Sequence, residues 1–135
     1  MISGNTPLMY AIYNDSAEDL IALLVKAGAS VRVVSSDGST PLIMAAYYGS
    51  ESLVSYFLKA GVPVNATDDE GKTALMRACE ELEDPAAVLS LLAAGADASP
   101  VDEEGKSARD YALENEYFGD DGALLERLAS PLSSL

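Results

Sequence analysis

The 135-residue sequence has no histidine, no tryptophan and a single cysteine, Cys79. Histidine is the commonest general base near neutral pH and the commonest protein ligand of zinc, so its absence removes the usual imidazole and zinc chemistries. One cysteine cannot form an internal disulfide. With no imidazole to activate it, Cys79 is expected to be a buried, inert thiol and not a nucleophile. We therefore expect a protein that is not an enzyme and that uses no cofactor and no metal.

Long apolar runs are missing as well. No stretch approaches the roughly 18 uninterrupted apolar residues that a membrane helix needs. The first ten residues, MISGNTPLMY, contain no basic group followed by an apolar core, which is the pattern of a secretion signal. The expected compartment is the cytoplasm, with no membrane as a partner. Because 49% of the residues are apolar and 22% are charged, we expect one folded domain over residues 1–135.

Basic residues are scarce, and the resulting negative charge is unevenly placed. Eight Lys and Arg residues stand against 22 Asp and Glu residues, which gives a net charge of −14. Residues 1–67 carry five acids and three bases, a net charge of −2, whereas residues 68–135 carry seventeen acids and five bases, a net charge of −12. This field argues against nucleic acid and anionic membranes as partners and favours a protein partner with a basic segment.

Two short phrases recur along the chain with a common period. The first phrase reads GNTPLMYAIYN, GSTPLIMAAYY, GKTALMRACEE and GKSARDYALEN, and its glycines lie at positions 4, 38, 71 and 105, at intervals of 34, 33 and 34 residues. The second phrase reads KAGASVR, KAGVPVN and AAGADAS, with glycines at positions 28, 61 and 95, at intervals of 33 and 34. Two phrases that share one period indicate an internal structural repeat.

The second copy shows how each part of the repeat acts physically. Thr40 can cap the free amide groups of a following helix, and Pro41 at the first helical position costs no hydrogen bond. A second helix is predicted from the apolar stripe Leu53, Val54, Phe57 and Leu58. Gly61 can adopt the left-handed conformation that ends this helix, and VPV then runs out extended. One repeat is therefore a helix, a turn, a second helix and an extended loop.

The segment GSTPLIMAAYYGSESLVSYFLKAGVPVN resembles the ankyrin repeat, and the resemblance covers essentially the whole chain. It implies an all-α ankyrin-repeat solenoid of stacked helix-turn-helix units joined by β-hairpin loops. The four repeats are expected at approximately 2–34, 35–67, 68–101 and 102–130, with 131–135 as a C-terminal tail. The family usually has histidine after TPL. Here Met9, Ile43 and Met76 stand at that position, so apolar packing must replace the usual threonine–histidine hydrogen bonds.

This resemblance implies a non-catalytic adaptor or regulator that binds a protein on its concave face, which is made by the inner helices and the hairpin tips. In the family's geometry the residues at the inner-helix ends are Tyr13, Asn14, Tyr47, Tyr48, Glu80, Glu81 and Glu114. Those at the hairpin tips are Ser36, Asp37, Ser39, Asp69, Glu70, Lys72, Glu103 and Glu104. The face is thus expected to be tyrosine-rich in its N-terminal half and acidic in its C-terminal half. Tyrosine supplies contact area at little entropic cost, and carboxylates orient basic segments.

Other interpretations of the same residues stay open. Glutamates at an exposed helix end are commonly a solvated face, and tyrosines next to small residues can cover a neighbouring repeat. The acidic half also suits an inhibitor or immunity-like protein that blocks the basic groove of a nucleic-acid-binding enzyme, and such binding would collapse with salt. DDEG at Asp68 and DEEG at Asp102 lack the ligand pattern of a calcium loop, so hairpin tips are expected there. A monomer is expected, with self-association through the first repeat as the alternative, because no polar cap precedes it.

Overall fold

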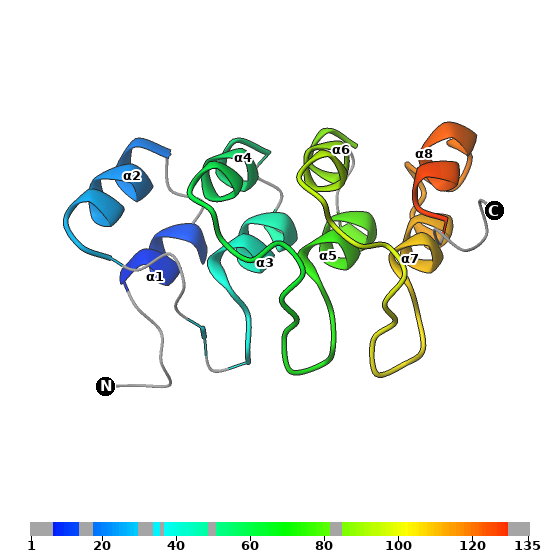
Figure 1. Ribbon diagram of the computed structural model, residues 1–135, viewed down its shortest axis with the longest axis horizontal. Coiled ribbons are helices and arrows are strands. Elements are labelled where there is room, and N and C mark those ends of the chain that lie inside the picture. Colours follow the sequence, from blue (N-terminus) through cyan, green and yellow to red (C-terminus); the bar gives the residue numbers. More distant parts are fainter. Residues whose placement is uncertain are drawn as a thin grey trace.

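The computed structural model describes residues 7–13, 18–29, 34–35, 37–48, 51–81 and 85–129. Within these ranges the chain forms eight helices and no strand longer than an isolated bridge. They are α1 (Pro7–Tyr13), α2 (Glu18–Lys26), α3 (Pro41–Tyr47), α4 (Glu51–Lys59), α5 (Ala74–Glu81), α6 (Ala86–Ala93), α7 (Ala108–Glu114) and α8 (Gly122–Arg127). Successive helices pack as pairs, and the pairs stack side by side along the longest axis (Figure 1). The expected all-α solenoid is confirmed.

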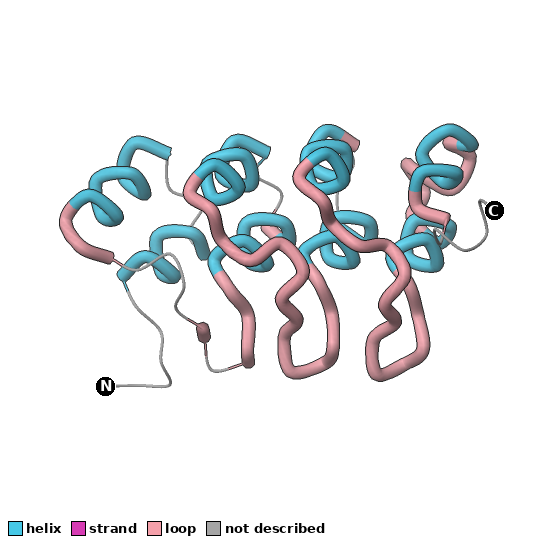
Figure 2. Tube along the Cα trace, in the orientation of Figure 1, coloured by secondary structure: helices cyan, strands magenta, loops and turns pink. Residues whose placement is uncertain are grey.

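The helices form two layers. The inner helices α1, α3, α5 and α7 pack against one another in one row, and α2, α4 and α6 pack in a second row above them. The connecting loops project from the inner row on the side away from the outer helices (Figure 2). None of the helices in the described ranges is long and apolar enough to cross a membrane.

The inner helices begin where the caps predict. Thr40 caps α3 by accepting a hydrogen bond from the Ile43 amide at 3.2 Å, and Pro41 is the first helical residue. Thr73 caps α5 in the same way, with the Met76 amide 3.2 Å from its hydroxyl. In α7, Ser107 and Asp110 exchange side-chain-to-backbone hydrogen bonds in a capping box. These caps fix the start of α3, α5 and α7, and therefore the angle at which each of their hairpin loops joins the helix.

The core lies between the two helix layers and runs through the whole stack. In α4, Leu53, Val54 and Phe57 are buried and Leu58 is partly buried, as their spacing predicts. Gly61 has a positive φ of 81° and follows the end of this helix. Met9, Ile43 and Met76, which stand where the family usually has histidine, are all buried in this core. Apolar packing therefore does replace a polar network at these positions.

The third and fourth hairpin loops are closed by backbone pairing, and each is tied to the hairpin before it. Thr67 pairs with Thr73, and Val101 pairs with Ser107, in isolated antiparallel bridges. The Asp69 amide donates to the Asp37 carbonyl oxygen at 3.0 Å, so the third hairpin is fastened to the second. The same contact recurs one repeat later, from the Glu103 amide to the Glu70 carbonyl. The segments DDEG and DEEG are therefore hairpin tips, as expected.

Candidate functional site

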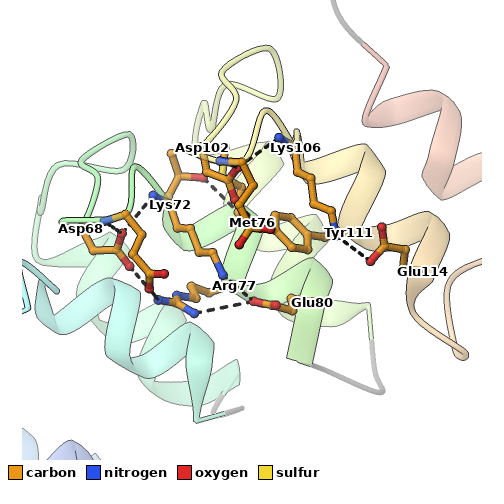
Figure 3. Close-up of polar contacts among 12 residues, drawn as sticks. Asp68, Lys72, Met76, Arg77, Glu80, Asp102, Lys106, Tyr111 and Glu114 are labelled. Carbon is orange, nitrogen blue, oxygen red and sulfur yellow. Dashed lines mark hydrogen bonds and ion pairs between the residues drawn. The ribbon is translucent and has the colours of Figure 1, made fainter.

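The candidate site is the surface that α3, α5 and α7 share with the three hairpin loops, which we call the hairpin-side face. Three side chains occupy equivalent positions near the ends of these helices: Tyr47, Glu80 and Glu114. Three more lie one turn earlier: Met44, Arg77 and Tyr111. Ion pairs, hydrogen bonds and cation–π contacts connect Arg77, Glu80, Tyr111 and Glu114 to the third and fourth hairpins, so these loops and helices form one continuous surface (Figure 3).

Arg77 joins the third hairpin to the neighbouring helices. Its Nη2 lies 2.8 Å from Oδ2 of Asp68 and 3.3 Å from Oε1 of Glu70, and its Nη1 lies 3.6 Å from Oε1 of Glu80. The Asp68 side chain is only 1% exposed, so removing Arg77 would leave a buried carboxylate without a compensating positive charge. Burial alone would lower the pKa of Arg77, but its hydrogen bond to Asp68 and the negative charge of that carboxylate raise the pKa above its ordinary value. The guanidinium also lies 5.3 Å from the ring centroid of Tyr47, which links repeat three to repeat two.

Tyr111 takes the position in the fourth repeat that Arg77 takes in the third, and several side chains contact it in the same way. The Nζ atoms of Lys72 and Lys106 each lie 5.1 Å from the centroid of its ring. Its hydroxyl donates a hydrogen bond to the buried carboxylate of Asp102. Lys106 is also paired with Glu114, with Nζ and Oε1 separated by 2.9 Å. A neutral ring between two ammonium groups thus connects the third repeat to the fourth.

These environments shift the pKa values of Asp102, Tyr111 and Cys79 further from neutral pH. Burial tends to raise the pKa of Asp102, but the hydrogen bonds from Tyr111 and from the Lys106 and Glu104 amides lower it overall. Burial, followed by the hydrogen bond to Asp102, raises the pKa of Tyr111. Burial also raises the pKa of the Cys79 thiol to about 12, and the expectation that this cysteine is buried is confirmed. Asp102 is therefore charged and Tyr111 neutral at physiological pH.

The N-terminal part of the face is aromatic. Tyr47 is 40% exposed and Tyr48 is 38% exposed, and their rings meet edge to face with centroids 4.8 Å apart. Tyr10, which is 53% exposed, takes the position in α1 that Met44 takes in α3. The sequence analysis missed Tyr10. Its signal was present, because it is the third residue after a helix-starting proline, as Met44 is.

Two residues expected at exposed hairpin tips are buried instead. Ser39 is 6% exposed, because its amide folds back onto the Asp37 carboxylate at 3.1 Å. Lys72 is 7% exposed, because its side chain leaves the hairpin and runs beneath the face toward Tyr111 and Glu80. The expectation that both residues lie exposed at the tips is wrong. They support the surface from within.

The acidic half is also less uniform than the sequence suggests. Glu70 and Glu80 meet at Arg77, and Glu114 meets Lys106, so these carboxylates alternate with cations. Apart from Glu70, the exposed tip carboxylates are Asp37, Asp69, Glu103 and Glu104, and the described residues place no cation within 4 Å of these four. The C-terminal part of the face holds Asp68, Asp69, Glu70, Glu80, Asp102, Glu103, Glu104 and Glu114 against Lys72, Arg77 and Lys106. Eight negative and three positive charges leave a net charge of −5.

Some expected site residues lie outside the described part of the chain. Asn14 and Ser36 fall there entirely. Tyr13 and Glu81 end α1 and α5, but their side chains are not among those described. Among the described residues, no group of three or more Asp, Glu or Cys side chains is placed to hold a metal ion.

Comparison with known proteins gives one informative match. The family model for ankyrin repeats, in three copies, matches residues 8–102, which is more than two thirds of the chain. The match covers the helix pairs from α1 to α6, and the α7–α8 pair continues the stack beyond it. No curated protein matches the chain significantly. Ankyrin repeats are protein-interaction modules and are typically non-catalytic. The repeated phrases, the capped inner helices, the hairpin loops and this match together show that the chain belongs to the ankyrin repeat family.

Proposed function

We propose that this protein is a non-catalytic adaptor or regulator that binds a basic segment of a protein partner on its hairpin-side face. One observation carries the proposal: exposed Tyr47 and Tyr48 lie directly beside a group of buried and exposed charged side chains with a net charge of −5, and Arg77 contacts the Tyr47 ring. A partner with apolar side chains next to Lys or Arg residues would satisfy both parts of this surface.

The two parts would contribute differently to binding. Tyrosine buries a large area with few rotatable bonds and is enriched among residues that dominate binding energy. The exposed carboxylates at the hairpin tips attract and orient positive charge, mainly by raising the association rate. The ion pairs of Arg77 and Lys106 hold the side chains between these parts in place before binding. Less conformational entropy is then lost when a partner docks.

We further propose that the protein acts as a monomer in the cytoplasm. Its net charge of −14 repels copies of the chain from one another. Its single buried thiol needs no oxidising compartment. The same charge makes nucleic acid and anionic membranes poor partners.

The proposal is tested with the chain immobilised as bait in lysate from its native cell. The test variant is Tyr47→Ala/Tyr48→Ala, and the control variant is Tyr117→Ala, an exposed tyrosine between α7 and α8. A protein retained at moderate salt by wild type and by the control, but not by the double variant, is the expected result. Equal retention by all three baits would contradict the proposed role of the tyrosines.

A second comparison tests the carboxylates. Glu103→Gln/Glu104→Gln removes exposed tip charges, and Glu126→Gln on α8 removes one exposed charge away from the face. We expect the tip variant to reduce capture at low salt and the control to leave it unchanged. If capture is lost at moderate salt and the tyrosine variant captures as much protein as wild type, the result would favour an acidic inhibitor of a basic enzyme instead.

A further inference from the structure

The hairpin tips present one acidic group per repeat at matching positions. Asp37, Glu70 and Glu104 each directly precede the glycine of their hairpin, and all three are exposed. The backbone hydrogen bonds from Asp69 to Asp37 and from Glu103 to Glu70 hold consecutive tips together. Packed helices lie about 8–10 Å apart, so the repeats that carry these tips follow one another at about that interval.

A second row runs parallel to the first along the inner helices. It consists of Tyr47, Glu80 and Glu114, again one residue per repeat. Arg77 contacts Tyr47 in this row and Glu70 in the tip row, so the two rows border the same surface. A segment that lies along the stack therefore meets two rows with one shared period.

Backbone geometry decides which segment repeats with that period. In a polyproline II helix every third residue points the same way, and three residues advance about 9.3 Å. In a β-strand, residues on one face recur about every 6.6 Å. In an α-helix seven residues advance about 10.5 Å, and their direction drifts by about 20° each time. Of these three conformations, the polyproline II helix advances by about the interval between repeats. Its side chains that point the same way therefore stay aligned with one row of residues on the face.

The aromatic end of the face favours the same conformation. Proline-rich segments dock on surfaces lined by aromatic rings, and they lose little entropy because they are extended before binding. Tyr47 and Tyr48 provide two exposed rings set edge to face at the start of the rows. Beyond them the carboxylates of the tip row suit Lys or Arg, whereas Glu80 and Glu114 in the second row are already paired with Arg77 and Lys106.

From these rows we infer that the partner segment binds as a polyproline II helix, with Lys or Arg at every third position along the tip row. Its proline or other apolar side chains contact Tyr47 and Tyr48. This inference rests on the proposed function and adds to it the conformation and the charge period of the partner.

The test uses fluorescent peptides of equal length and charge, titrated with the full chain at moderate salt and followed by anisotropy. One peptide repeats Arg-Pro-Pro, so that arginine recurs every third residue. A second has the same composition with its arginines adjacent to one another. A third repeats Arg-Ala-Ala, which keeps the number and sequence spacing of the arginines but favours an α-helix, in which they no longer point the same way. We expect the first peptide to bind about tenfold more tightly than either of the others, which corresponds to about 1.4 kcal/mol.

Variants connect this preference to the tip row. Glu70→Gln/Glu104→Gln should remove most of the advantage of the periodic peptide, and Glu126→Gln should preserve it. Circular dichroism of each variant shows whether the helices remain folded. Equal affinity for all three peptides would overturn the inferred period while leaving a basic partner on this face intact. Failure of every basic peptide to bind would overturn the proposed function together with the inference.

Discussion

At the scale of single residues, Arg77 is the side chain whose loss should be felt most. The carboxylate of Asp68 is 1% exposed and lies 2.8 Å from this guanidinium. Removing one partner of a buried ion pair leaves an uncompensated charge and typically costs about 3–5 kcal/mol. The amides of Glu70 and Lys72 also donate to Asp68, so we expect Arg77→Met to cost about 3 kcal/mol in the free energy of unfolding.

Urea unfolding of a double-mutant cycle measures this cost. Because Asp68→Asn removes the charge that Arg77 neutralises, the double variant should lose much less stability than the sum of the two single variants. Single variants within about 1 kcal/mol of wild type, or simple additivity, would show that the pair is not coupled as its 2.8 Å contact indicates.

Tyr111 predicts a change in stability at alkaline pH. Its pKa is raised above the ordinary value of 10.0 by burial and by its hydrogen bond to Asp102. Above pH 10 the unfolded phenol ionises while the folded one stays neutral, so this residue destabilises the fold by up to about 1.4 kcal/mol per pH unit. Below pH 10 its contribution is fully present.

The difference between wild type and Tyr111→Phe isolates this titration from the other tyrosines. The variant should be less stable by about 2 kcal/mol at neutral pH, since it lacks a buried hydrogen bond to a charged acceptor. Stability curves from pH 8 upward should then converge as the wild type loses its advantage above pH 10. Parallel curves across this range would rule out a raised pKa for Tyr111.

At the scale of elements, the hairpins are held by close approach as well as by hydrogen bonds. Gly38 has a φ of 82°, and a Cβ atom there would lie 2.4 Å from Oδ1 and 2.7 Å from the amide nitrogen of Asp69. Gly105 has a nearly equal φ of 78°, but a Cβ atom there would meet nothing within 4 Å. The two glycines differ only in whether another hairpin covers them.

Alanine substitutions at these two glycines separate backbone strain from contact. Gly105→Ala should cost about 1–2 kcal/mol, the strain of a left-handed backbone with a Cβ atom. Gly38→Ala should cost more, because the second and third hairpins must also move apart. Thermal unfolding of both variants provides the comparison. Equal costs would mean that the contact between hairpins contributes nothing to stability.

The elements were largely predictable from the sequence, and the reason is local. Thr40, Pro41 and Gly61 act within a few residues of themselves, so their roles can be deduced from position alone. Lys72 could not be placed in this way, because its burial depends on Tyr111, a residue 39 positions later in the chain. The alternation of cations and carboxylates on the face was also missed. It is created where a hairpin folds back onto the inner helix of its own repeat, as in the pairs of Arg77 with Asp68 and of Lys106 with Glu114.

At the scale of the whole molecule, stability should be distributed as a sum over neighbouring repeats. Leu91 on α6 and Leu124 on α8 are both buried, but α6 packs against α5 and against α4 of the preceding repeat, whereas α8 packs on α7 at the end of the stack. A defect at an end costs at most the unfolding of that end, because the remaining repeats stay folded. A defect in the interior weakens the entire stack.

We therefore expect Leu91→Ala to lower the unfolding free energy of the whole chain by about 3–4 kcal/mol. Leu124→Ala should leave the main transition nearly unchanged and instead increase amide hydrogen exchange in α7 and α8. Hydrogen exchange combined with urea unfolding distinguishes the two outcomes. A large loss in the main transition from Leu124→Ala would contradict a repeat-by-repeat stack.

The most direct measurement of the central claim is the salt dependence of partner binding by wild type, Tyr47→Ala/Tyr48→Ala and Glu103→Gln/Glu104→Gln. If aromatic and acidic parts of one face act together, the tyrosine variant loses about tenfold or more at every salt concentration, and the glutamate variant loses affinity mainly at low salt. If the tyrosine variant matches wild type and all binding disappears at high salt, the aromatic part of the face is not a binding surface. The claim of a mixed aromatic and acidic binding face would then be wrong.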